Sequence, residues 1–385
     1  MKKLFLLAFL LLSTLSANSK KAGEFTVLQW NIWQEGTSVP GGYDAIINEI
    51  VRLKPDFVTF SEVRNYNKSN FSARVLSSLR EKGLAYYSFY SYDTGLLSKH
   101  PITDSLTVFP ENGDHGSIYR LLATVNGRKV AVYTAHLDYL DCAYYNVRGY
   151  DGSTWKEIPK PQTVEEVLKV NTDSQRDDAI KLFIDQAHKD MANEYSIILG
   201  GDFNEPSHRD WLETNKDMYD HNGMVIPWTV TTLLEEAGFI DSYREIYPDP
   251  LTHPGFTYPS DNLLIAPEKL TWAPKADERD RIDFIFYQGK GLQAEKAIIF
   301  GPKSSIVRSQ RVKETSKDKF LLPKGVWPTD HKGLLVTFRF TEQIDKYLIM
   351  SIYQSVHFCD TRVYTLIQQE CTLLLYKSVH SYNSY

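Results

Sequence analysis

The sequence predicts an α/β protein in which strands and helices are arranged in layers. Stretches rich in β-branched and aromatic residues, typical of strands, recur along the chain, and segments with apolar residues at helical spacing lie between some of them. The hydrophobic fraction of 42% is enough for a large core. We find no short internal repeat and no low-complexity linker, so we predict one domain over residues 24–340.

The first part of this domain reads as strand, helix, strand. A strand is predicted for FTVLQW at 25–30, a helix at 43–53, and a second strand, DFVTF, that leads to Glu62. A later helix, from about 175 to 188, leads into the strand YSIIL. Further strands are predicted for GLLSKHPI, YRLLATV, KVAVYTAHLD, RIDFIFYQ and KGLLVTFRF, with a hairpin turn at Asn126-Gly127.

Two segments fit this pattern poorly. Residues 139–172 form an aromatic insertion loop with Gly and Pro, and either a lid or binding loop or a surface insertion with its own packing explains it. Residues 341–385 follow the predicted closing strand, show no clean period, and receive no predicted role.

The N-terminus has the order of a secretory signal peptide. Lys2 and Lys3 precede the apolar run Leu4 to Leu12, and small and polar residues follow up to Ala17. A membrane anchor needs about 20 apolar residues, so this run is too short. We therefore predict that residues 1–17 are a cleaved signal peptide and that the protein is secreted or periplasmic.

Charge and cysteine content exclude some functional classes. The chain has 43 Lys and Arg against 48 Asp and Glu, a net charge of −5 that becomes more negative by two without Lys2 and Lys3. That balance does not favour nucleic acid as a partner, although a local basic patch would permit it. Three cysteines are too few for a disulfide scaffold and supply too few thiolates for a zinc site. One disulfide among them is possible, and the sequence does not assign its pairing.

Residues 195–207, YSIILGGDFNEPS, show a polar pair after an apolar strand. Asp202 and Asn204 flank Phe203, and the local alternative is that both side chains bond nearby backbone amides in a turn. If the segment stays extended, side chains two residues apart point to the same face, which would place two oxygen donors over one spot.

The same kind of polar residue occurs at other predicted strand ends, where function collects in α/β sheets. Oxygen donors are supplied by Asn31, Glu62, Asp202, Asn204, Asp283 and Asp330, and imidazoles by His136 and His331. Oxygen ligands without cysteine favour Mg²⁺, Mn²⁺ or Ca²⁺ over zinc. Mg²⁺ with one or two carboxylates keeps positions for water and phosphate oxygen, which suits phosphoryl chemistry.

The ordered motifs LQWNIW, FSEVR, GLLSKHPI, TAHLD, GGDFNEP, RIDFIF and TDHKGLLV resemble the endonuclease/exonuclease/phosphatase superfamily, the DNase I-like metal-dependent phosphoesterases. The resemblance spans about residues 24–340. It implies a four-layered α/β sandwich, in which two mixed β-sheets pack face to face with helices outside.

The resemblance also implies roles. Asn31, Glu62 and Asp330 would form the metal site, with Glu62 the principal ligand, and Mg²⁺ is expected, with Mn²⁺ or Ca²⁺ as alternatives. Asp202 would orient or deprotonate the attacking water, Asn204 would hold a phosphate oxygen, and Arg64 would contact substrate. His331 resembles the catalytic histidine, oriented by Asp283, and His136 would protonate the leaving oxygen or contact phosphate.

Each of these residues has a structural alternative. Asn31 and Glu62 could cap following helices. His136 could be a hydrogen-bonded core histidine, and Asp283 could pair with Arg279 or Arg281. Arg64 could belong to a surface ion pair.

The function predicted from the sequence is an exported, divalent-metal-dependent hydrolase that attacks a phosphodiester or phosphomonoester with activated water. We favour a small-molecule or lipid-linked substrate, keep contact with a lipid surface open, and expect a monomer. One alternative is a secreted DNase I-like nuclease. An alternative of another class is a secreted binding protein that keeps the fold without the chemistry, although no predicted catalytic position is missing from the sequence.

Overall fold

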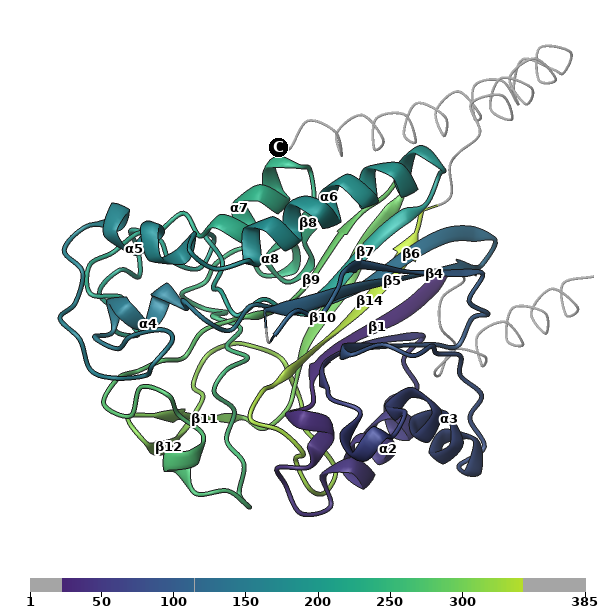
Figure 1. Ribbon diagram of the computed structural model, residues 1–385, viewed down its shortest axis with the longest axis horizontal. Helices are drawn as coiled ribbons and strands as arrows, with labels where there is room; N and C mark the ends of the chain where they lie inside the picture. Colours follow the sequence, from purple (N-terminus) through teal and green to yellow (C-terminus); the bar gives the residue numbers. More distant parts are fainter. Residues whose placement is uncertain (1–22, 114, 342–385) are drawn as a thin grey trace, which may run out of the picture. The chain divides into compact units, whose positions relative to one another are not determined.

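The computed structural model describes residues 23–113 and 115–341 (Figure 1). The predicted signal peptide lies outside the described residues, as do Cys359, Cys371 and all of the predicted tail except Thr341. The remaining cysteine, Cys142, is buried and has a free thiol.

The described part of the chain contains two six-stranded mixed sheets, which we call sheet A and sheet B. In spatial order, sheet A consists of β13 (Phe320–Leu321), β10 (Leu292–Phe300), β14 (Gly333–Phe340), β1 (Glu24–Asn31), β2 (Phe57–Val63) and β3 (Asp93–Ser98). Sheet B consists of β4 (Asp104–Phe109), β5 (Gly116–Val125), β6 (Arg128–Leu137), β7 (Ser196–Asp202), β9 (Asp283–Gln288) and β8 (Ile240–Asp241). A separate hairpin is formed by β11 (Ser304–Val307) and β12 (Gln310–Lys313).

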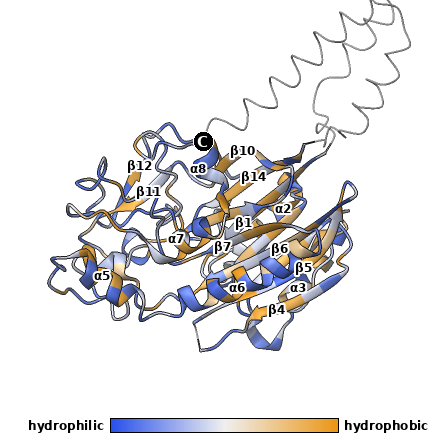
Figure 2. Ribbon diagram, turned by 90° about the horizontal axis from the view of Figure 1, so that it is seen from above, coloured by the Kyte–Doolittle hydropathy of each residue, from blue (hydrophilic) through white to orange (hydrophobic). Residues whose placement is uncertain are grey.

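Helices cover the outer faces of both sheets. On sheet A, α2 (Gly42–Leu53) and α3 (Phe71–Glu81) pack through Ile46, Ile50, Val75 and Leu79 against strands β1 and β2. On sheet B, α6 (Arg176–Ala192) and α7 (Thr229–Glu236) pack against β7 and β9. The short helix α8 (Ser242–Ile246) follows β8. Figure 2 shows that hydrophobic residues are concentrated in the strands, whereas helix α6 is mixed.

The core between the sheets follows from strand alternation. Val27 faces a cluster that also contains Val132 of β6 and Ile198 of β7, whereas its neighbour Leu28 faces the helices on the other side of sheet A. Successive side chains of a strand point to opposite faces, so a strand covered on both faces must be apolar throughout. The fold is the predicted four-layered α/β sandwich, which is confirmed.

The elements predicted from the sequence are largely present. Strands β1 and β2 pair in parallel around α2, and β5 and β6 form the hairpin predicted at Asn126-Gly127. The prediction for GLLSKHPI was too long, because β3 ends at Ser98. Helices α3, α7 and α8 and the strands β4, β8 and β10 to β13 were not predicted from the sequence.

The insertion loop at 139–172 contains two short helices. It contains α4 (Ala143–Val147) and α5 (Val164–Asn171), the second of which begins with a capping box between Thr163 and Glu166. The two helices belong to a separate apolar cluster that includes Tyr144, Trp211 and Trp228. The insertion therefore has its own packing, and it also reaches the pocket described below.

The described residues form no helix that is both long and apolar enough to cross a membrane.

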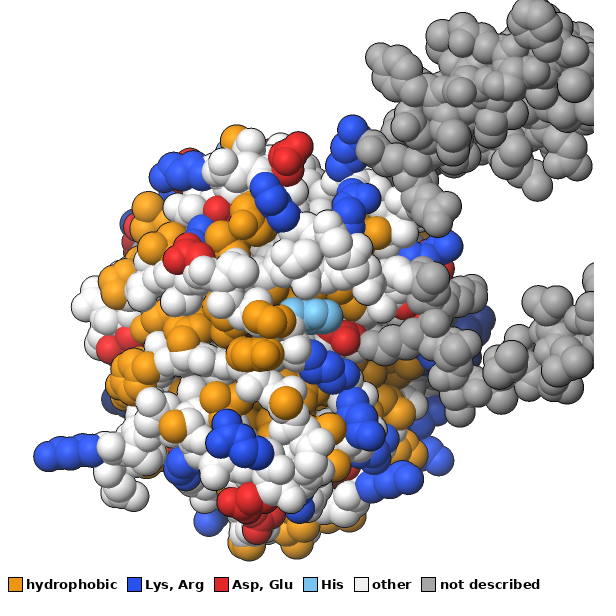
Figure 3. All heavy atoms as spheres, turned by 90° about the vertical axis from the view of Figure 1, so that its right-hand side faces the viewer, with side chains coloured by type: hydrophobic (Ala, Val, Ile, Leu, Met, Phe, Trp, Pro, Cys, Tyr) orange, Lys and Arg blue, Asp and Glu red, His pale blue; other side chains and the backbone are white. Residues whose placement is uncertain are grey.

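Figure 3 shows the face at the right of Figure 1, where Lys and Arg side chains surround a band of hydrophobic side chains.

Candidate active site

The candidate site lies where one end of sheet A meets one end of sheet B. Two hydrogen bonds join the sheets there: the Ser61 hydroxyl donates to the carbonyl of Ala135 over 3.1 Å, and the Asp202 amide donates to the Ser61 hydroxyl over 3.2 Å. Gly200 allows this close approach, because a Cβ at that position would overlap the side chain of Thr59 in sheet A. Gly200 thus serves the packing of the two sheets at the site, whereas a Cβ at Gly201 would overlap Ala135 of the neighbouring strand β6.

Sheet B brings three of the predicted residues side by side. His136 of β6 pairs in register with Asp202 of the parallel strand β7, and Asp202 pairs with Asp283 of the antiparallel strand β9. Since β9 runs opposite to β7, the start of one strand meets the end of the other. This arrangement explains why a polar residue that begins a strand belongs with two that end strands.

His331 is held by Asp283. The Nδ1 atom of His331 lies 2.9 Å from Asp283 Oδ2, and the ring packs against Tyr258 with 4.8 Å between ring centroids. Burial lowers the pKa of His331, but the carboxylates of Asp283, Asp202 and Asp330 outweigh burial and raise the pKa to about 10. Asp283 is therefore no partner of the nearby arginines: Arg279 pairs with Asp277 and Arg281 with Asp210.

A second histidine–carboxylate pair involves a residue that the sequence analysis missed. His136 Nδ1 lies 2.8 Å from Oδ1 of Asp93, the first residue of β3, and the same oxygen accepts from Arg64 Nη1 over 2.7 Å. Burial lowers the pKa of His136, but Asp93, with Asp202 and Glu62, raises it to about 9. The available signal was a polar residue at the start of a strand, as for Asp283.

Asp202 and Asn204 form the predicted turn and also belong to the candidate site. One carboxylate oxygen of Asp202, Oδ1, accepts from the Asn204 backbone amide over 3.0 Å, which is the turn that local reasoning predicts. The other oxygen, Oδ2, accepts from Asn31 Nδ2 over 2.8 Å. The Asn204 side chain donates to the Leu137 carbonyl over 2.8 Å. Burial and Asp283 raise the pKa of Asp202 to about 6, against the opposite effect of His331 and His136.

Asn31 bonds a backbone amide at the helix that follows it, as weighed for it, whereas Glu62 bonds the helix that precedes it in the sequence. Asn31 Oδ1 accepts from the Trp33 amide and Glu62 Oε2 from the Gln34 amide, each over 2.9 Å, at the start of the 3-10 helix Gln34–Gly36. Asn31 Nδ2 also donates to Glu62 Oε1 over 3.0 Å. Glu62 lies at a β-bulge with φ of 68°, and a bulge redirects a side chain out of the strand pattern.

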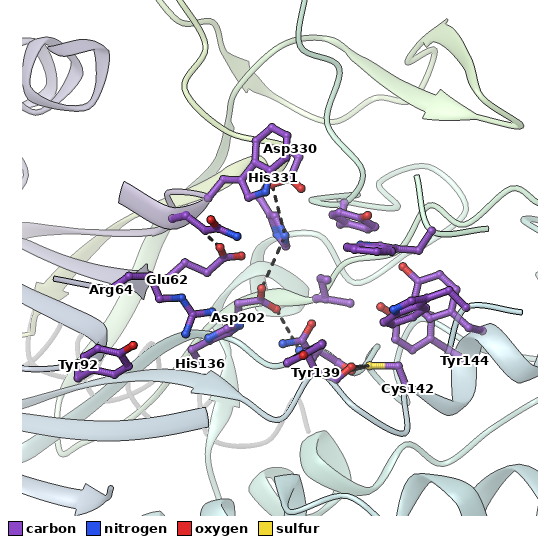
Figure 4. Close-up of a pocket in the computed structure, with 18 of the residues that line it drawn as sticks. Glu62, Arg64, Tyr92, His136, Tyr139, Cys142, Tyr144, Asp202, Asp330 and His331 are labelled. Atoms are coloured by element: carbon purple, nitrogen blue, oxygen red, sulfur yellow. Dashed lines mark hydrogen bonds and ion pairs between the residues drawn. The ribbon is translucent and has the colours of Figure 1, made fainter. Parts of the chain in front are cut away.

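A pocket of about 450 Å³ opens onto these groups. Figure 4 shows Asp202 near its centre, with Glu62 and Arg64 on one side and Tyr144 on the other. Among the predicted residues, the following line the pocket: Glu62, Arg64, His136, Asp202, Asn204, Asp330 and His331. Asn31 and Asp283 are fully buried and reach the site through their bonds to Asp202 and His331.

The donor set suits a divalent cation. Burial raises the pKa of Asp330 to about 7, opposed by His331 and reinforced by Glu62, so negative charge is crowded where a cation would relieve it. Ligand atoms of Asp202, Asp283 and His331 also lie within 4.8 Å of one another and could hold a metal ion. Because Asp283 and His331 already bond each other, we keep Glu62 and Asp330 as the predicted ligands. Asn31 acts here as a hydrogen-bond donor to Glu62, and its ligation of metal stays a prediction.

The comparisons with known proteins identify a family. The model of the Endonuclease/Exonuclease/phosphatase family matches residues 28–331. An uncharacterised protein of Caenorhabditis elegans, F14F9.5, is 26% identical over 338 residues, which are 88% of this chain and 98% of that protein.

Two solved structures are more distant. TDP2 of D. rerio, complexed with a single-strand DNA product, is 15% identical, with 82% of this chain and 99% of that chain covered and a TM-score of 0.46. The catalytic domain of human Nocturnin, with a bound sulfate anion, is 16% identical, with 83% and 95% covered and a TM-score of 0.47. At such TM-scores we draw nothing further from them. Since the family match covers most of the chain and the site is complete, the chain belongs to the Endonuclease/Exonuclease/phosphatase family and is a metal-dependent hydrolase of phosphate ester bonds.

Proposed function

We propose that this chain is an exported enzyme that hydrolyses a small or lipid-linked phosphate ester with an activated water molecule. The observation that carries the proposal is the convergence on one pocket of side chains from both sheets, including two histidines, each bonded to a carboxylate. These side chains supply the groups that phosphoester hydrolysis needs, namely a base, proton donors and positive charge near the phosphate.

Asp202 is the proposed base. Bonds from Asn31 and from the Asn204 amide fix both of its oxygens, so the carboxylate keeps one orientation in the pocket. A fixed carboxylate can orient a water molecule and accept its proton as the water attacks phosphorus. Asn204, whose backbone amide holds Asp202, lines the pocket beside it and is the proposed contact for a phosphate oxygen.

The two histidines are the proposed sources of positive charge. In each ring Nδ1 is bonded to a carboxylate, so Nε2 is the atom directed toward the reacting groups. His331 Nε2 lies 3.7 Å from Asp202 Oδ2, close to where the phosphate would be attacked. His331 would stabilise charge on the phosphate oxygens, and His136 would protonate the leaving oxygen.

A divalent cation held by Glu62 and Asp330 would add positive charge at the phosphate, and Mg²⁺ is the proposed ion, with Mn²⁺ or Ca²⁺ as alternatives. The protein's own contribution is the position of these carboxylates. Glu62 is fixed by the Gln34 amide and by Asn31, and the Asp330 backbone carbonyl accepts from Ser260 over 2.6 Å.

Pocket size and charge support a small substrate. A volume of about 450 Å³ is that of a small-molecule site. Among the described residues that line it, Arg64 is the single Lys or Arg, and it is paired with Asp93. A nucleic acid would need several basic contacts along its backbone. A DNA or RNA polymer is therefore the less favoured substrate.

The decisive experiment is a substrate panel with and without EDTA: bis-p-nitrophenyl phosphate, DNA, sphingomyelin and inositol phosphates, each tested with Mg²⁺ or Mn²⁺. We expect EDTA-sensitive hydrolysis of a small or lipid-linked ester that is lost in Asp202→Ala. Asp178→Ala, which removes an exposed partner of Lys181 on helix α6, is the control and should keep activity. Release of no product from any of these esters would contradict the proposal.

Export is proposed from the sequence alone. If residues 1–17 are a signal peptide, expression of the full chain in a secreting host should place the protein outside the cytoplasm with a new N-terminus near residue 18. N-terminal sequencing of the purified protein is the measurement. A cytoplasmic product that begins at Met1 would contradict export without affecting the enzymatic proposal.

A further inference from the structure

The end of the pocket away from Glu62 is lined by aromatic side chains. They come from the insertion and from the segment between helix α8 and strand β9: Tyr139, Tyr144, Tyr145, Trp155, Tyr258 and Trp272. In Figure 4 the labelled Tyr139 and Tyr144 lie to the right of Asp202, opposite Glu62 and Arg64. We propose that the indoles of Trp155 and Trp272 form a stacking subsite for a flat ring carried by the phosphate ester. This inference rests on the proposed function and deepens it by assigning a substrate class.

The two indoles form a pair that extends from the core to solvent. Their ring centroids are 4.9 Å apart and their planes are inclined by 31°. Trp155 contacts the buried Tyr145 edge-on, with 5.1 Å between centroids. Trp272 stays 49% exposed although it lines the pocket. An indole supported on its inner side and open on its outer side offers a rigid surface on which a second ring can stack.

The backbone holds Trp155 in an unusual conformation. Its φ of 59° lies in the left-handed region, which a bulky residue rarely adopts. The Asp151 carboxylate fixes the turn before it by accepting from the Ser153 amide over 3.1 Å and the Thr154 amide over 2.6 Å. The Trp155 amide then donates to the Asp151 carbonyl over 2.9 Å. These bonds hold the Trp155 backbone, and with it the indole, in one position at the pocket.

The neighbouring contacts leave this turn little room to shift. Gly152 packs directly on Cys142, where a Cβ would overlap the Cys142 backbone. On the other side of the pair, the Trp272 and Ala273 amides donate to the buried Glu278 carboxylate over 3.2 and 3.1 Å. Both indoles are thus carried on loops anchored by buried or bonded carboxylates.

The charge of the pocket defines the ligand class. Among the described residues that line the pocket, the basic side chains are Arg64, His136 and His331, and each is bonded to a carboxylate. A nucleic-acid polymer requires a row of basic contacts, which this lining does not provide. The proposed ligand is a small phosphodiester with one aromatic or heteroaromatic ring, whose phosphate lies at Asp202 and His331 and whose ring lies on Trp155 and Trp272.

The first test is a binding measurement that differs only in the ring. Calorimetric titrations compare thymidine 5′-monophosphate with 2-deoxyribose 5-phosphate, which has the same sugar and phosphate without the base. We expect the nucleotide to bind about 10-fold more tightly. Trp272→Ala should remove most of this preference and leave 2-deoxyribose 5-phosphate unaffected. Trp272→Phe should retain part of it, and Tyr90→Ala, at an exposed tyrosine that is not part of the pocket lining, should retain all of it.

The second test uses turnover. Thymidine 5′-(p-nitrophenyl phosphate) and methyl p-nitrophenyl phosphate share a leaving group, and kcat/KM should be about 10-fold higher for the first. Trp272→Ala should reduce that ratio to near one. Trp155→Ala should reduce the ratio in the same way. If the Trp155 variant does not fold, the Trp272→Ala variant still tests the proposal, because Trp272 is exposed and its removal should leave the fold intact.

The outcomes separate this inference from the proposed function. Equal affinities of the two phosphates in the unmodified protein, or equal losses of both in Trp272→Ala, would overturn the subsite even if Asp202 proves essential for hydrolysis. Tighter binding of glucose 6-phosphate than of the nucleotide would show that the subsite prefers a sugar to a flat ring, and it would also overturn the proposal. Faster cleavage of a DNA oligonucleotide than of the small diesters would overturn the small-ligand class. A ring preference in binding without hydrolysis of any ester would support the subsite while contradicting the proposed function.

Discussion

His331 Nδ1 lies 2.9 Å from Asp283 Oδ2, and this bond joins the two halves of the sandwich. Asp283 begins strand β9 of sheet B, whereas His331 precedes strand β14 of sheet A. Because both groups are buried, neither can exchange its partner for water without cost. The bond orients the imidazole so that Nε2 faces Asp202.

Removing the charge of Asp283 should impair turnover more than binding. In Asp283→Asn the side chain no longer favours the tautomer and charge of His331, so we expect kcat to fall about 10²- to 10⁴-fold with KM changed little. Steady-state kinetics on bis-p-nitrophenyl phosphate measure both constants. Thermal unfolding of the same variant checks the fold. A loss confined to KM, or full activity, would contradict an orienting role for Asp283.

The metal prediction concerns Glu62 and Asp330. Glu62→Gln and Asp330→Asn remove one negative charge each, so we expect a higher Mg²⁺ concentration at half-maximal activity and weaker Mn²⁺ binding in calorimetry. Asp178→Asn, which alters an exposed carboxylate on α6, should match the unmodified protein in both measurements. If both site variants bound Mn²⁺ as tightly as that control, the cation would be held elsewhere, and Asp202, Asp283 and His331 would be the next candidates.

A buried histidine outside the site predicts sensitivity to acid. His221 stacks on Trp211 with 3.7 Å between ring centroids, and burial, helped by Arg148, lowers its pKa to about 2. The unfolded pKa is about 6.5, so the folded state binds fewer protons below that pH. The stability contribution of neutral His221 is therefore complete above about pH 6.5 and is lost as pH falls towards 2.

The matched variant for this prediction is His221→Phe, which keeps a flat ring and cannot titrate. Its free energy of unfolding in urea, relative to the unmodified protein, should rise as pH falls below about 6.5, by up to about 1.4 kcal/mol per pH unit. A difference between the two proteins that does not change with pH would show that protonation of His221 carries no penalty.

The contact between Gly200 and Thr59 leaves no room for a larger side chain at position 200 between the two sheets. In Gly200→Ala the new methyl group would overlap Thr59 Oγ1 and lie 3.1 Å from Thr59 Cβ, so we expect destabilisation by about 1–3 kcal/mol. The cost should be smaller in a Thr59→Ala background, because that change removes the overlapping oxygen. Chemical unfolding of the two single variants and the double variant measures the coupling. Strict additivity would rule out this contact as the cause.

Several site residues could be found from the sequence because the information is local. An apolar strand that ends in Asp202 or Glu62 predicts a polar side chain at the edge of a sheet. The ordered motifs predict that these strand ends belong to one site. Asp93 has the same signal in weaker form. It lies in none of the motifs that carry the family resemblance, and its pairing with His136 is visible only in the folded chain.

The roles of single atoms could not be read from the sequence. Asn31 and Glu62 were weighed as caps of the following helices or as site residues. In the structure Asn31 Oδ1 bonds the Trp33 amide and Glu62 Oε2 bonds the Gln34 amide of the preceding 3-10 helix, while other atoms of the two side chains bond each other. Likewise, Asp202 makes the turn with Oδ1 and accepts from Asn31 with Oδ2. A sequence pattern shows which residue is polar. The hydrogen-bond partner of each side-chain oxygen depends on which donors the folded chain places beside it.

The sequence by itself determined the alternation of strands and helices and the strand ends that carry polar groups, because alternation and turn signals are properties of neighbouring residues. The sandwich and the phosphoesterase family followed from the resemblance of its ordered motifs to that family. The tertiary structure alone decided that Asp93 supports His136, that residues 139–172 pack as short helices, and that Trp155 meets Trp272 at the pocket. These pairings join segments far apart in the chain. They depend on the packing of two sheets and an insertion, which local preferences do not specify.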